Sequence, residues 1–254
     1  SQSLITPRTT KTLNELKNRG HLVVIATGRP YRLALPFYEQ LGLNTPMVNF
    51  NGGLVTFPNK KWKSEHQAEI NKDIVLEIVK KKSDYQLSFV SAENKEKFFV
   101  DNFKHFEPTF FGATTFQKEN LLTEENLTIQ PSSILVKVND IEKKLSVTDN
   151  LRNDFGEFLE VNPWGGPEPI LELLPKGVHK SSGIERIKKE YDINRKDVIA
   201  VGDEYNDIEM LKSAGLGVAM KNASDEVKKY ANQVTSRTND DEGLSRFLEE
   251  FFSL

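Results

Sequence analysis

The chain has 254 residues, 37% hydrophobic and 28% charged, with a formal net charge of −3, which is typical of a globular protein of one large or two unequal domains. Basic residues are interspersed with acidic ones, no apolar run reaches the about 18 residues of a membrane span, and there is no cysteine. These features argue against nucleic-acid and membrane partners, exclude disulfide and zinc–thiolate sites, and favour a cytoplasmic protein.

The first 53 residues alternate between helix and strand patterns. Thr6 is a predicted N-cap, Pro7 suits the first helical position and Gly20 ends the helix. Five continuous apolar residues at 22–26 predict a strand that is buried on both faces. A second helix and a second short strand are predicted at residues 31–43 and 46–53.

The last 80 residues repeat this alternation. Helices are predicted at residues 180–193, 205–215, 224–232 and 242–252, and strands at 197–203, 216–220 and 233–236. Strands that alternate with helices indicate right-handed βαβ units. We therefore expect an α/β fold with a doubly wound parallel, Rossmann-like core sheet.

The middle of the chain has a different pattern. Two strand–turn–strand signals, a strand followed by a helix, and two strands around a Pro/Gly-rich loop predict an α+β insertion with its own antiparallel sheet. Residues 1–57 and 173–254 are thus predicted to form the core domain, and residues 58–172 the inserted domain.

Most aromatic residues of the insertion are interpreted as core residues, with a substrate-stacking role open for some of them: Trp62, Phe98, Phe99, Phe103, Phe106 and Trp164. His105 and His179 are the two histidines that are candidates for testing, and His179 is interpreted as an exposed loop residue.

Polar residues follow the predicted parallel strands at their carboxyl ends, where ligands of such sheets bind. Residues 27–29 (Thr-Gly-Arg), 51–53 (Asn-Gly-Gly) and 203–207 (Asp-Glu-Tyr-Asn-Asp) all lie at this rim, and Lys180 begins the helix that re-enters the sheet. Hydroxyl, ammonium and backbone N–H groups suit a phosphate dianion, whereas clustered carboxylates would repel it unless a cation lay between them. Oxygen ligands beside a phosphate indicate Mg²⁺.

Each motif by itself has a simpler interpretation. Residues 26–30 (ATGRP) are compatible with an ordinary strand-to-helix turn. Residues 202–207 (GDEYND) are compatible with a capped helix start, and Lys180 with a solvated lysine. The order of the motifs at successive strand ends favours a shared site, and no P-loop or G-x-G-x-x-G motif follows a strand.

These motifs resemble the haloacid dehalogenase superfamily of phosphatases, and within it the Cof-type sugar phosphatases that carry a large α/β cap (type IIB). The resemblance is carried by TGRP, NGG, PKGVHK and GDEYND, and it spans nearly the whole chain. It implies a cap that selects the leaving group, and a core that binds the phosphate.

The resemblance also implies roles for individual residues in catalysis and metal binding. Thr27 would hold the transferring phosphoryl group, and Lys180 would neutralise its charge. Asp203 would ligate Mg²⁺, with Asn206 and Asp207 completing or orienting the metal shell. Glu204 is expected to face solvent or to cap the following helix.

Further residues would bind the phosphate or border it. Gly28 would contribute its backbone amide, Arg29 would line the pocket, and Asn51 and Gly52 would border the phosphate. Asn222 matches a family asparagine near the site, although Lys221 stands where the family usually has glycine.

One family motif is absent. The family begins with a strand that ends in D-x-D-G-T, whose first Asp is the nucleophile and whose second Asp is the general acid and base. Neither aspartate occurs in this chain, and we expect the corresponding strand to precede Ser1 in the native protein, between the strands at 22–26 and 197–203.

The expected function is Mg²⁺-dependent hydrolysis of small phosphomonoesters, such as sugar phosphates, through an aspartyl-phosphate intermediate whose nucleophile lies before Ser1. Two alternatives stay open. One is a phosphosugar mutase or phosphotransferase of the same superfamily, and the other is a phosphate-binding module without catalysis. The expected partner is a small phosphorylated metabolite, and the expected assembly is a monomer or a homodimer.

Overall fold

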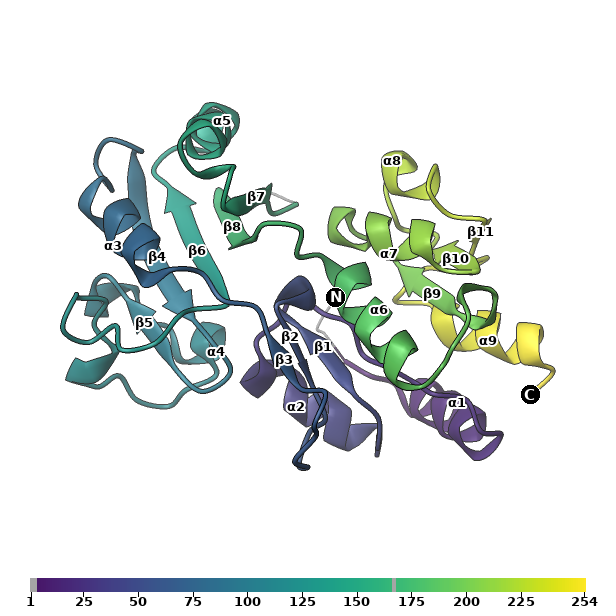
Figure 1. Ribbon diagram of the computed structural model, residues 1–254. Coiled ribbons are helices and arrows are strands. Elements are labelled where there is room, and N and C mark those ends of the chain that lie inside the picture. Colours follow the sequence, from purple (N-terminus) through teal and green to yellow (C-terminus); the bar gives the residue numbers. More distant parts are fainter. Residues whose placement is uncertain (1–3, 166–167) are drawn as a thin grey trace. The chain divides into compact units, whose positions relative to one another are not determined.

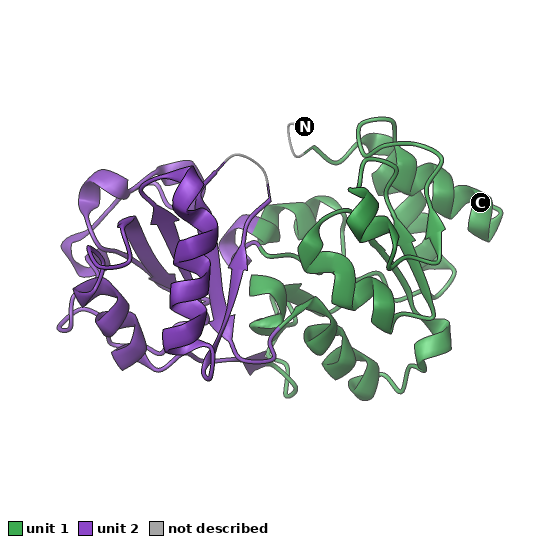
Figure 2. Ribbon diagram, turned by 90° about the horizontal axis from the view of Figure 1, so that it is seen from above, with its two compact units in different colours: residues 1–28, 34–65, 179–254 green, residues 29–33, 66–178 purple. Residues whose placement is uncertain are grey.

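The computed structural model describes residues 4–165 and 168–254. The chain divides into two compact units, which Figure 2 colours separately. Unit 1 comprises residues 1–28, 34–65 and 179–254, and unit 2 comprises residues 29–33 and 66–178.

Unit 1 is built from short strands and helices of the two ends of the chain (Figure 1). Its strands are β1 (Met47–Asn49), β2 (Leu54–Thr56), β9 (Ile199–Gly202), β10 (Leu216–Ala219) and β11 (Gln233–Val234). Its α-helices are α1 (Pro7–Asn18), α6 (Lys180–Glu190), α7 (Ile208–Ser213), α8 (Asp225–Lys228) and α9 (Gly243–Phe252). Its 3₁₀ turns are η1 (Phe50–Gly52), η5 (Arg195–Asp197) and η6 (Tyr205–Asp207). Helix α2 (Tyr31–Gln40) begins in unit 2 and ends in unit 1.

The parallel sheet of unit 1 has the order β11-β10-β9. Its register pairs Ala219 of β10 with Gly202 of β9, so both strands end at the same edge. The buried side chains of these strands pack with those of α7 and α8, among them Ala200, Leu211 and Val227. The fold class predicted from the sequence, α/β with a parallel core sheet, is confirmed.

The segment at residues 22–26 differs from its prediction. It forms a single parallel bridge, between Ala26 and Val48 of β1, and all five residues are half-buried rather than buried. Val48 donates its N–H to the Ile25 carbonyl at 2.9 Å and accepts from the Thr27 N–H at 2.9 Å. Within the described residues no strand pairs with the other edge of this segment, and this explains its partial exposure.

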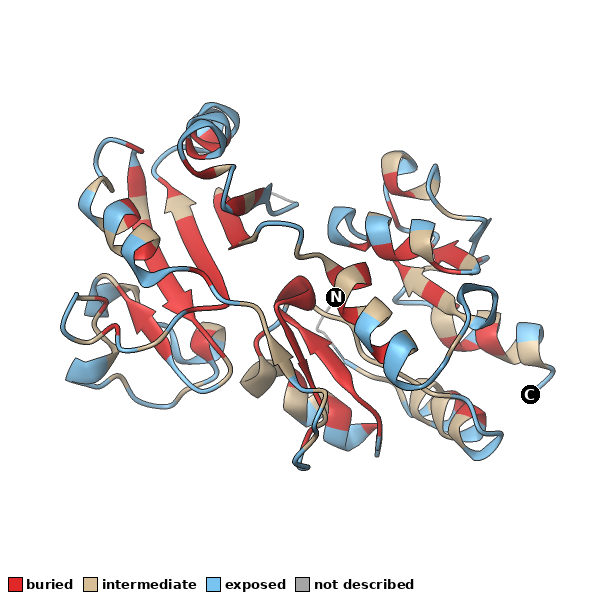
Figure 3. Ribbon diagram, viewed as in Figure 1, coloured by how far each residue is buried: buried red, intermediate tan, exposed pale blue. Residues whose placement is uncertain are grey.

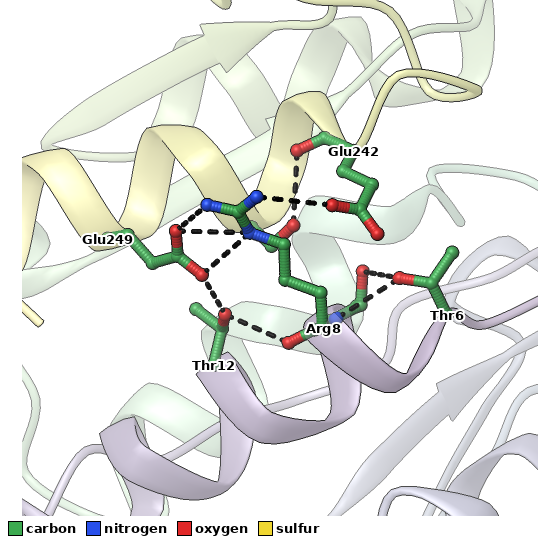
Figure 4. A network of polar contacts seen from close by, with 7 residues as sticks. Thr6, Arg8, Thr12, Glu242 and Glu249 are labelled. Carbon is green, nitrogen blue, oxygen red and sulfur yellow. Dashed lines mark hydrogen bonds and ion pairs between the residues drawn. The ribbon is translucent and has the colours of Figure 1, made fainter.

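Helix α1 begins and ends as the sequence predicts. Thr6 is the N-cap, its side chain accepts from the Thr9 N–H, and Pro7 occupies the first turn. Figure 4 shows that α1 is held against α9 by Arg8, whose guanidinium pairs with Glu249 and Glu242. The N-terminal and C-terminal helices of unit 1 are therefore tied together.

Unit 2 contains an antiparallel sheet in the order β5-β4-β6-β8-β7. Its strands are β4 (Leu87–Glu93), β5 (Phe98–Val100), β6 (Ser133–Val138), β7 (Leu159–Pro163) and β8 (Ile170–Pro175), and the two-residue strand β3 (His66–Gln67) precedes them. Its α-helices are α3 (Lys72–Lys80), α4 (Pro108–Phe111) and α5 (Lys144–Phe155), and its 3₁₀ turns are η2 (Phe103–His105), η3 (Lys118–Asn120) and η4 (Ile141–Lys143). The strands β4 to β8 and helix α5 form the predicted strand–turn–strand, strand–helix and strand–loop–strand pattern, whereas α3 and α4 were not predicted.

The two faces of this sheet carry different side chains, because successive residues of a strand point to opposite faces. Figure 3 shows that the central strands β4 and β6 are mostly buried. On one face, Val90 and Ala92 pack into the main core with Val75 of α3 and Leu151 of α5. On the other face, a smaller cluster contains Phe89, Phe98, Phe111, Leu135 and Ile170.

The six aromatic residues named in the sequence analysis differ in burial. Phe106 packs partly buried against a core cluster of unit 2, and Trp62 packs partly buried against a cluster of unit 1. Phe98 and Phe99 are buried, whereas Phe103 is 63% exposed and Trp164 is 39% exposed. Among the residues that the structure describes, no helix has the length and the apolar character needed to cross a membrane.

Candidate active site

Lys180 and Asp207 form a buried ion pair at the rim of the parallel sheet of unit 1. Lys180 is the first residue of α6, and its Nζ lies 2.7 Å from Oδ1 of Asp207. The two residues are only 7% and 4% exposed. An ammonium and a carboxylate removed from water together hold each other in place, since either one alone would be costly to bury.

The second oxygen of Asp207 organises the loop that follows β9. Asp207 Oδ2 accepts hydrogen bonds from the backbone N–H groups of Asp203 at 2.9 Å and of Glu204 at 3.1 Å. Gly202 permits this turn, because a Cβ there would lie 2.5 Å from the Asp207 side chain. Both carboxylate oxygens of Asp207 are therefore engaged by groups of the protein.

Asn206 and Asn51 connect this loop to the loop that contains Thr27 and Gly28. Asn206 Oδ1 lies 3.3 Å from the Lys180 Nζ, and its Nδ2 donates to Asn51 Oδ1 at 3.1 Å. The Asn51 N–H donates to the Thr27 carbonyl at 3.1 Å, and a Cβ on Gly28 would lie 2.9 Å from Asn51 Nδ2. The three loops after the segment at 22–26, after β1 and after β9 thus meet at one place.

The start of α6 is held against the turn that contains Gly52. Gly52 has a φ of +106°, and a Cβ there would lie 2.3 Å from the His179 carbonyl oxygen. His179 is the N-cap of α6, and its Nδ1 accepts from the Ser182 N–H at 3.2 Å. The interpretation of His179 as an exposed loop residue was wrong: it is half-buried, and it fixes the helix end that presents Lys180.

Asp203 is held by two asparagine amides. Its Oδ2 accepts from Nδ2 of Asn222 at 3.2 Å and from Nδ2 of Asn239 at 2.7 Å. Asn239 was not among the predicted site residues. It follows β11, the third parallel strand of this sheet, so the strand-end rule that identified the other residues also applies to it.

The predicted site residues within unit 1 come together through these contacts. They are Thr27, Gly28, Asn51, Gly52, Lys180, Asp203, Asn206, Asp207 and Asn222. Arg29 is exposed and belongs to the short segment of unit 2.

The loop at residues 203–207 contains three carboxylates, and Lys180 pairs with one of them. Partial burial raises the pKa of Glu204, the negative charges of Asp203 and Asp207 raise it further, and Lys180 acts in the opposite direction. Although part of its carboxylate is desolvated, Glu204 is an exposed residue, as the sequence analysis expects. The loop therefore favours an added positive charge.

Asp203 is the carboxylate of this site that suits a divalent cation. Its Oδ1 has no hydrogen-bond partner among the described residues. No group of three or more His, Asp or Glu side chains that could hold a metal ion is found among residues 4–165 and 168–254. Mg²⁺ commonly binds through one or two carboxylates and takes its other ligands from water and phosphate oxygens. The oxygen donors present here fit such an ion, with this chain supplying one carboxylate.

Comparisons with known proteins agree with this architecture. Residues 1–248 match the family model of the haloacid dehalogenase-like hydrolases. The 5-amino-6-(5-phospho-D-ribitylamino)uracil phosphatase YitU of Bacillus subtilis is 36% identical over 251 residues, which cover 98% of this chain and 92% of that protein.

Two solved structures share the fold. The crystal structure of a haloacid dehalogenase-like hydrolase from Bacteroides thetaiotaomicron superposes with a TM-score of 0.82 at 26% identity, covering 99% of this chain and 94% of that one. The subclass IIB sugar phosphatase BT4131 has a TM-score of 0.77 at 20% identity, covering 100% and 94% of the two chains, and supports the fold alone. The chain belongs to the haloacid dehalogenase-like hydrolases.

Proposed function

We propose that this hydrolase is a phosphatase that releases inorganic phosphate from small phosphomonoesters with the help of Mg²⁺. The observation that carries the proposal is the buried Lys180–Asp207 pair, whose ammonium lies beside Asn206 where three strand-end loops meet. A fixed positive charge among N–H donors at the carboxyl edge of a parallel sheet is suited to a phosphate dianion.

The residues of this chain have separate tasks in the proposed mechanism. Thr27 and the Gly28 amide bind the phosphoryl group, and Asn51 and Gly52 border it. Lys180 compensates the charge on the phosphoryl oxygens, and Asp207 keeps the Lys180 ammonium in position. Preorganised charge of this kind commonly supplies most of the acceleration in phosphoryl transfer.

The metal site is proposed to include Asp203, with Asn206 and Asp207 as its supporting residues. When bound, Mg²⁺ supplies charge neutralisation for the phosphoryl group. Because both oxygens of Asp207 are already engaged, we assign Asp207 to positioning rather than to direct ligation. Asn222 acts on Asp203 rather than on the phosphate.

The two-step route expected from the resemblance completes the proposal. An oxygen of the first aspartate attacks phosphorus, the bond from phosphorus to the leaving oxygen breaks, and the second aspartate gives its proton to the leaving alcohol. The second aspartate then takes a proton from a water molecule, whose oxygen attacks phosphorus of the aspartyl phosphate. The bond between phosphorus and the first aspartate breaks, which releases phosphate and restores both aspartates. Both aspartates are those of the D-x-D-G-T motif that the resemblance implies, and none of the residues placed above replaces them.

The substrate class is proposed from chemistry and from the relatives. The expected substrates are sugar phosphates and similar phosphorylated metabolites. We add 5-amino-6-(5-phospho-D-ribitylamino)uracil to the candidates, because the relative YitU is named as a phosphatase of this compound. The cytoplasmic location, the monomer or homodimer, and the assignment of unit 1 as core and unit 2 as cap remain predictions.

A phosphate-release screen tests the proposal. The protein, expressed from its natural start codon, is mixed with a panel of phosphomonoesters that includes this ribityl compound, with Mg²⁺ or with EDTA. We expect Mg²⁺-dependent release of inorganic phosphate from at least one ester. Binding without release at every ester would support the non-catalytic module, and transfer of phosphate between hydroxyls of a sugar bisphosphate would support the mutase.

A further inference from the structure

We propose that Asn239 is a positioning residue that, together with Asn222, holds one oxygen of Asp203 so that the other oxygen stays available to a divalent cation. This inference rests on the proposed function, in which Asp203 binds Mg²⁺. It adds a residue that lies outside the motifs of the site, in the loop between β11 and α9.

Both amides donate to the same carboxylate oxygen. Asn239 Nδ2 lies 2.7 Å from Asp203 Oδ2, and Asn222 Nδ2 lies 3.2 Å from it. The orientation of the Asn222 amide is set by a further bond, because its Oδ1 accepts from the backbone N–H of Asn239 at 2.9 Å. The nitrogen of Asn222 must then face Asp203.

The loop that carries Asn239 is fixed by its own hydrogen bonds. Thr235 is buried, and its Oγ1 accepts from the Lys221 N–H at 2.9 Å and donates to the Arg237 carbonyl at 2.6 Å. The Gly243 N–H donates to the Thr238 carbonyl at 2.9 Å, and a Cβ on Gly243 would lie 2.2 Å from the Arg237 carbonyl oxygen. Asn239 is therefore presented to Asp203 by an ordered turn.

Asp203 and Asp207 have different hydrogen-bond partners in the protein. Asp207 is paired with an ammonium and uses both oxygens within the protein. Among the described residues, Asp203 is bonded to two neutral amides at one oxygen, and its Oδ1 has no hydrogen-bond partner. A carboxylate that is fixed in orientation but not neutralised is what a cation ligand requires, and such supporting hydrogen bonds are general features of metal sites.

The test measures binding of Mn²⁺, as a paramagnetic stand-in for Mg²⁺, in the absence of substrate. Asn239→Ala removes the side-chain bond to Asp203 but keeps the bond to Asn222, because the latter comes from the backbone N–H. Asn239→Leu keeps the branched shape of the side chain and also lacks the donor. Ser236→Ala, at an exposed position of the same loop, is the matched control.

We expect the Mn²⁺ dissociation constant, followed by electron paramagnetic resonance of the free ion, to rise about 10- to 100-fold in both Asn239 variants and to stay unchanged in the control. The Mg²⁺ concentration for half-maximal phosphate release should rise in parallel, while kcat at saturating Mg²⁺ and Tm without metal change little. A loss of folding alone would lower Tm and kcat together.

The outcomes separate this inference from the proposed function. If the unchanged protein binds Mn²⁺ and the Asn239 variants bind it equally well, the positioning role is wrong and the proposed function stands. If the unchanged protein binds neither Mn²⁺ nor Mg²⁺, the proposed metal site itself is wrong, and the positioning role fails with it.

Discussion

Lys180 and Asp207 are charged residues that depend on each other for burial. Removing one partner of a buried pair leaves the other charge without compensation, which typically costs about 3–5 kcal/mol. We therefore expect Lys180→Met to lower the free energy of unfolding by about 3 kcal/mol. Turnover should fall by about 100-fold or more, since a charge that stabilises the transition state is lost.

The double variant Lys180→Met/Asp207→Asn separates these two effects. It removes both charges, so stability measured by urea unfolding should recover most of the loss while turnover stays low. Lys144→Met serves as the control, because Lys144 is also buried but its Nζ donates to the Trp164 and Glu168 carbonyls rather than to an acid. Equal destabilisation by both lysine variants would contradict the argument.

At the scale of elements, the joint between η1 and α6 depends on Gly52. Alanine there would combine a positive φ with a Cβ only 2.3 Å from the His179 carbonyl oxygen. We expect Gly52→Ala to cost about 1–2 kcal/mol for the backbone conformation and about 1–3 kcal/mol more for the overlap. Because His179 precedes Lys180, turnover should fall as well.

Gly20 provides the matched control for this prediction. It has a φ of +90° and nothing within 4 Å of the position of a Cβ. Gly20→Ala should therefore lose only the conformational part, about 1–2 kcal/mol, and keep its turnover. The prediction is checked by measuring the unfolding free energy and the rate of phosphate release of both variants. Similar values for Gly52→Ala and Gly20→Ala would contradict it.

The tie between α1 and α9 makes part of the stability depend on pH. The hydrogen bond from Arg8 lowers the pKa of Glu249 from its usual value of 4.5, and a bond from Thr12 acts in the same direction (Figure 4). A depressed carboxyl pKa in the folded state stabilises the fold above the unfolded pKa, and this contribution is lost as the pH falls through the folded pKa.

Glu249→Gln tests this pH dependence. We expect the Tm of the unchanged protein to exceed that of the variant near pH 7. The difference should shrink as the pH falls below 4.5, the pKa of an unperturbed glutamate, and through the lower pKa of Glu249 in the folded protein. A Tm difference that stays constant from pH 7 to the acid limit of folding would show that the Arg8–Glu249 pair does not titrate in this way.

At the scale of the whole molecule, the two units have separate cores, but unit 2 includes a short segment from elsewhere in the chain. Arg32 of that segment pairs with Glu93 and donates its Nε–H to the Phe111 carbonyl. Glu93 is buried, and desolvation raises its pKa although Arg32 acts in the opposite direction. The continuous part of unit 2, residues 66–178, lacks this arginine.

A fragment of residues 66–178 tests how far unit 2 depends on Arg32. We expect the fragment to unfold cooperatively, because the core between its sheet and α3 and α5 is intact. Glu93→Gln should make the fragment more stable at pH 7, since it removes a buried carboxylate that has lost its partner. In the full chain the same substitution should be destabilising, and circular dichroism during urea unfolding measures both.

Much of the fold could be predicted because its signals are local. The cap at Thr6, the strand at Ile199–Gly202 and the alternation of helices with strands are read from neighbouring residues. The partial exposure of residues 22–26 is not predicted by their apolar run, since strand burial depends on pairing with distant segments. It agrees instead with the expectation that a strand absent from the described residues pairs with the other edge of this segment. His179 was misinterpreted because histidine is not among the preferred N-cap residues.

The sequence by itself determined the α/β class, the order of the strand-end motifs and the set of polar residues at the rim. Periodicity is a local property, and the carboxyl ends of parallel strands share one edge. Only the tertiary structure decided how these residues are used. Asp207 pairs with Lys180, 27 residues away, and Asn239 reaches Asp203 across 36 residues. Such pairings depend on differences of about an ångström between distant segments, which no local pattern encodes.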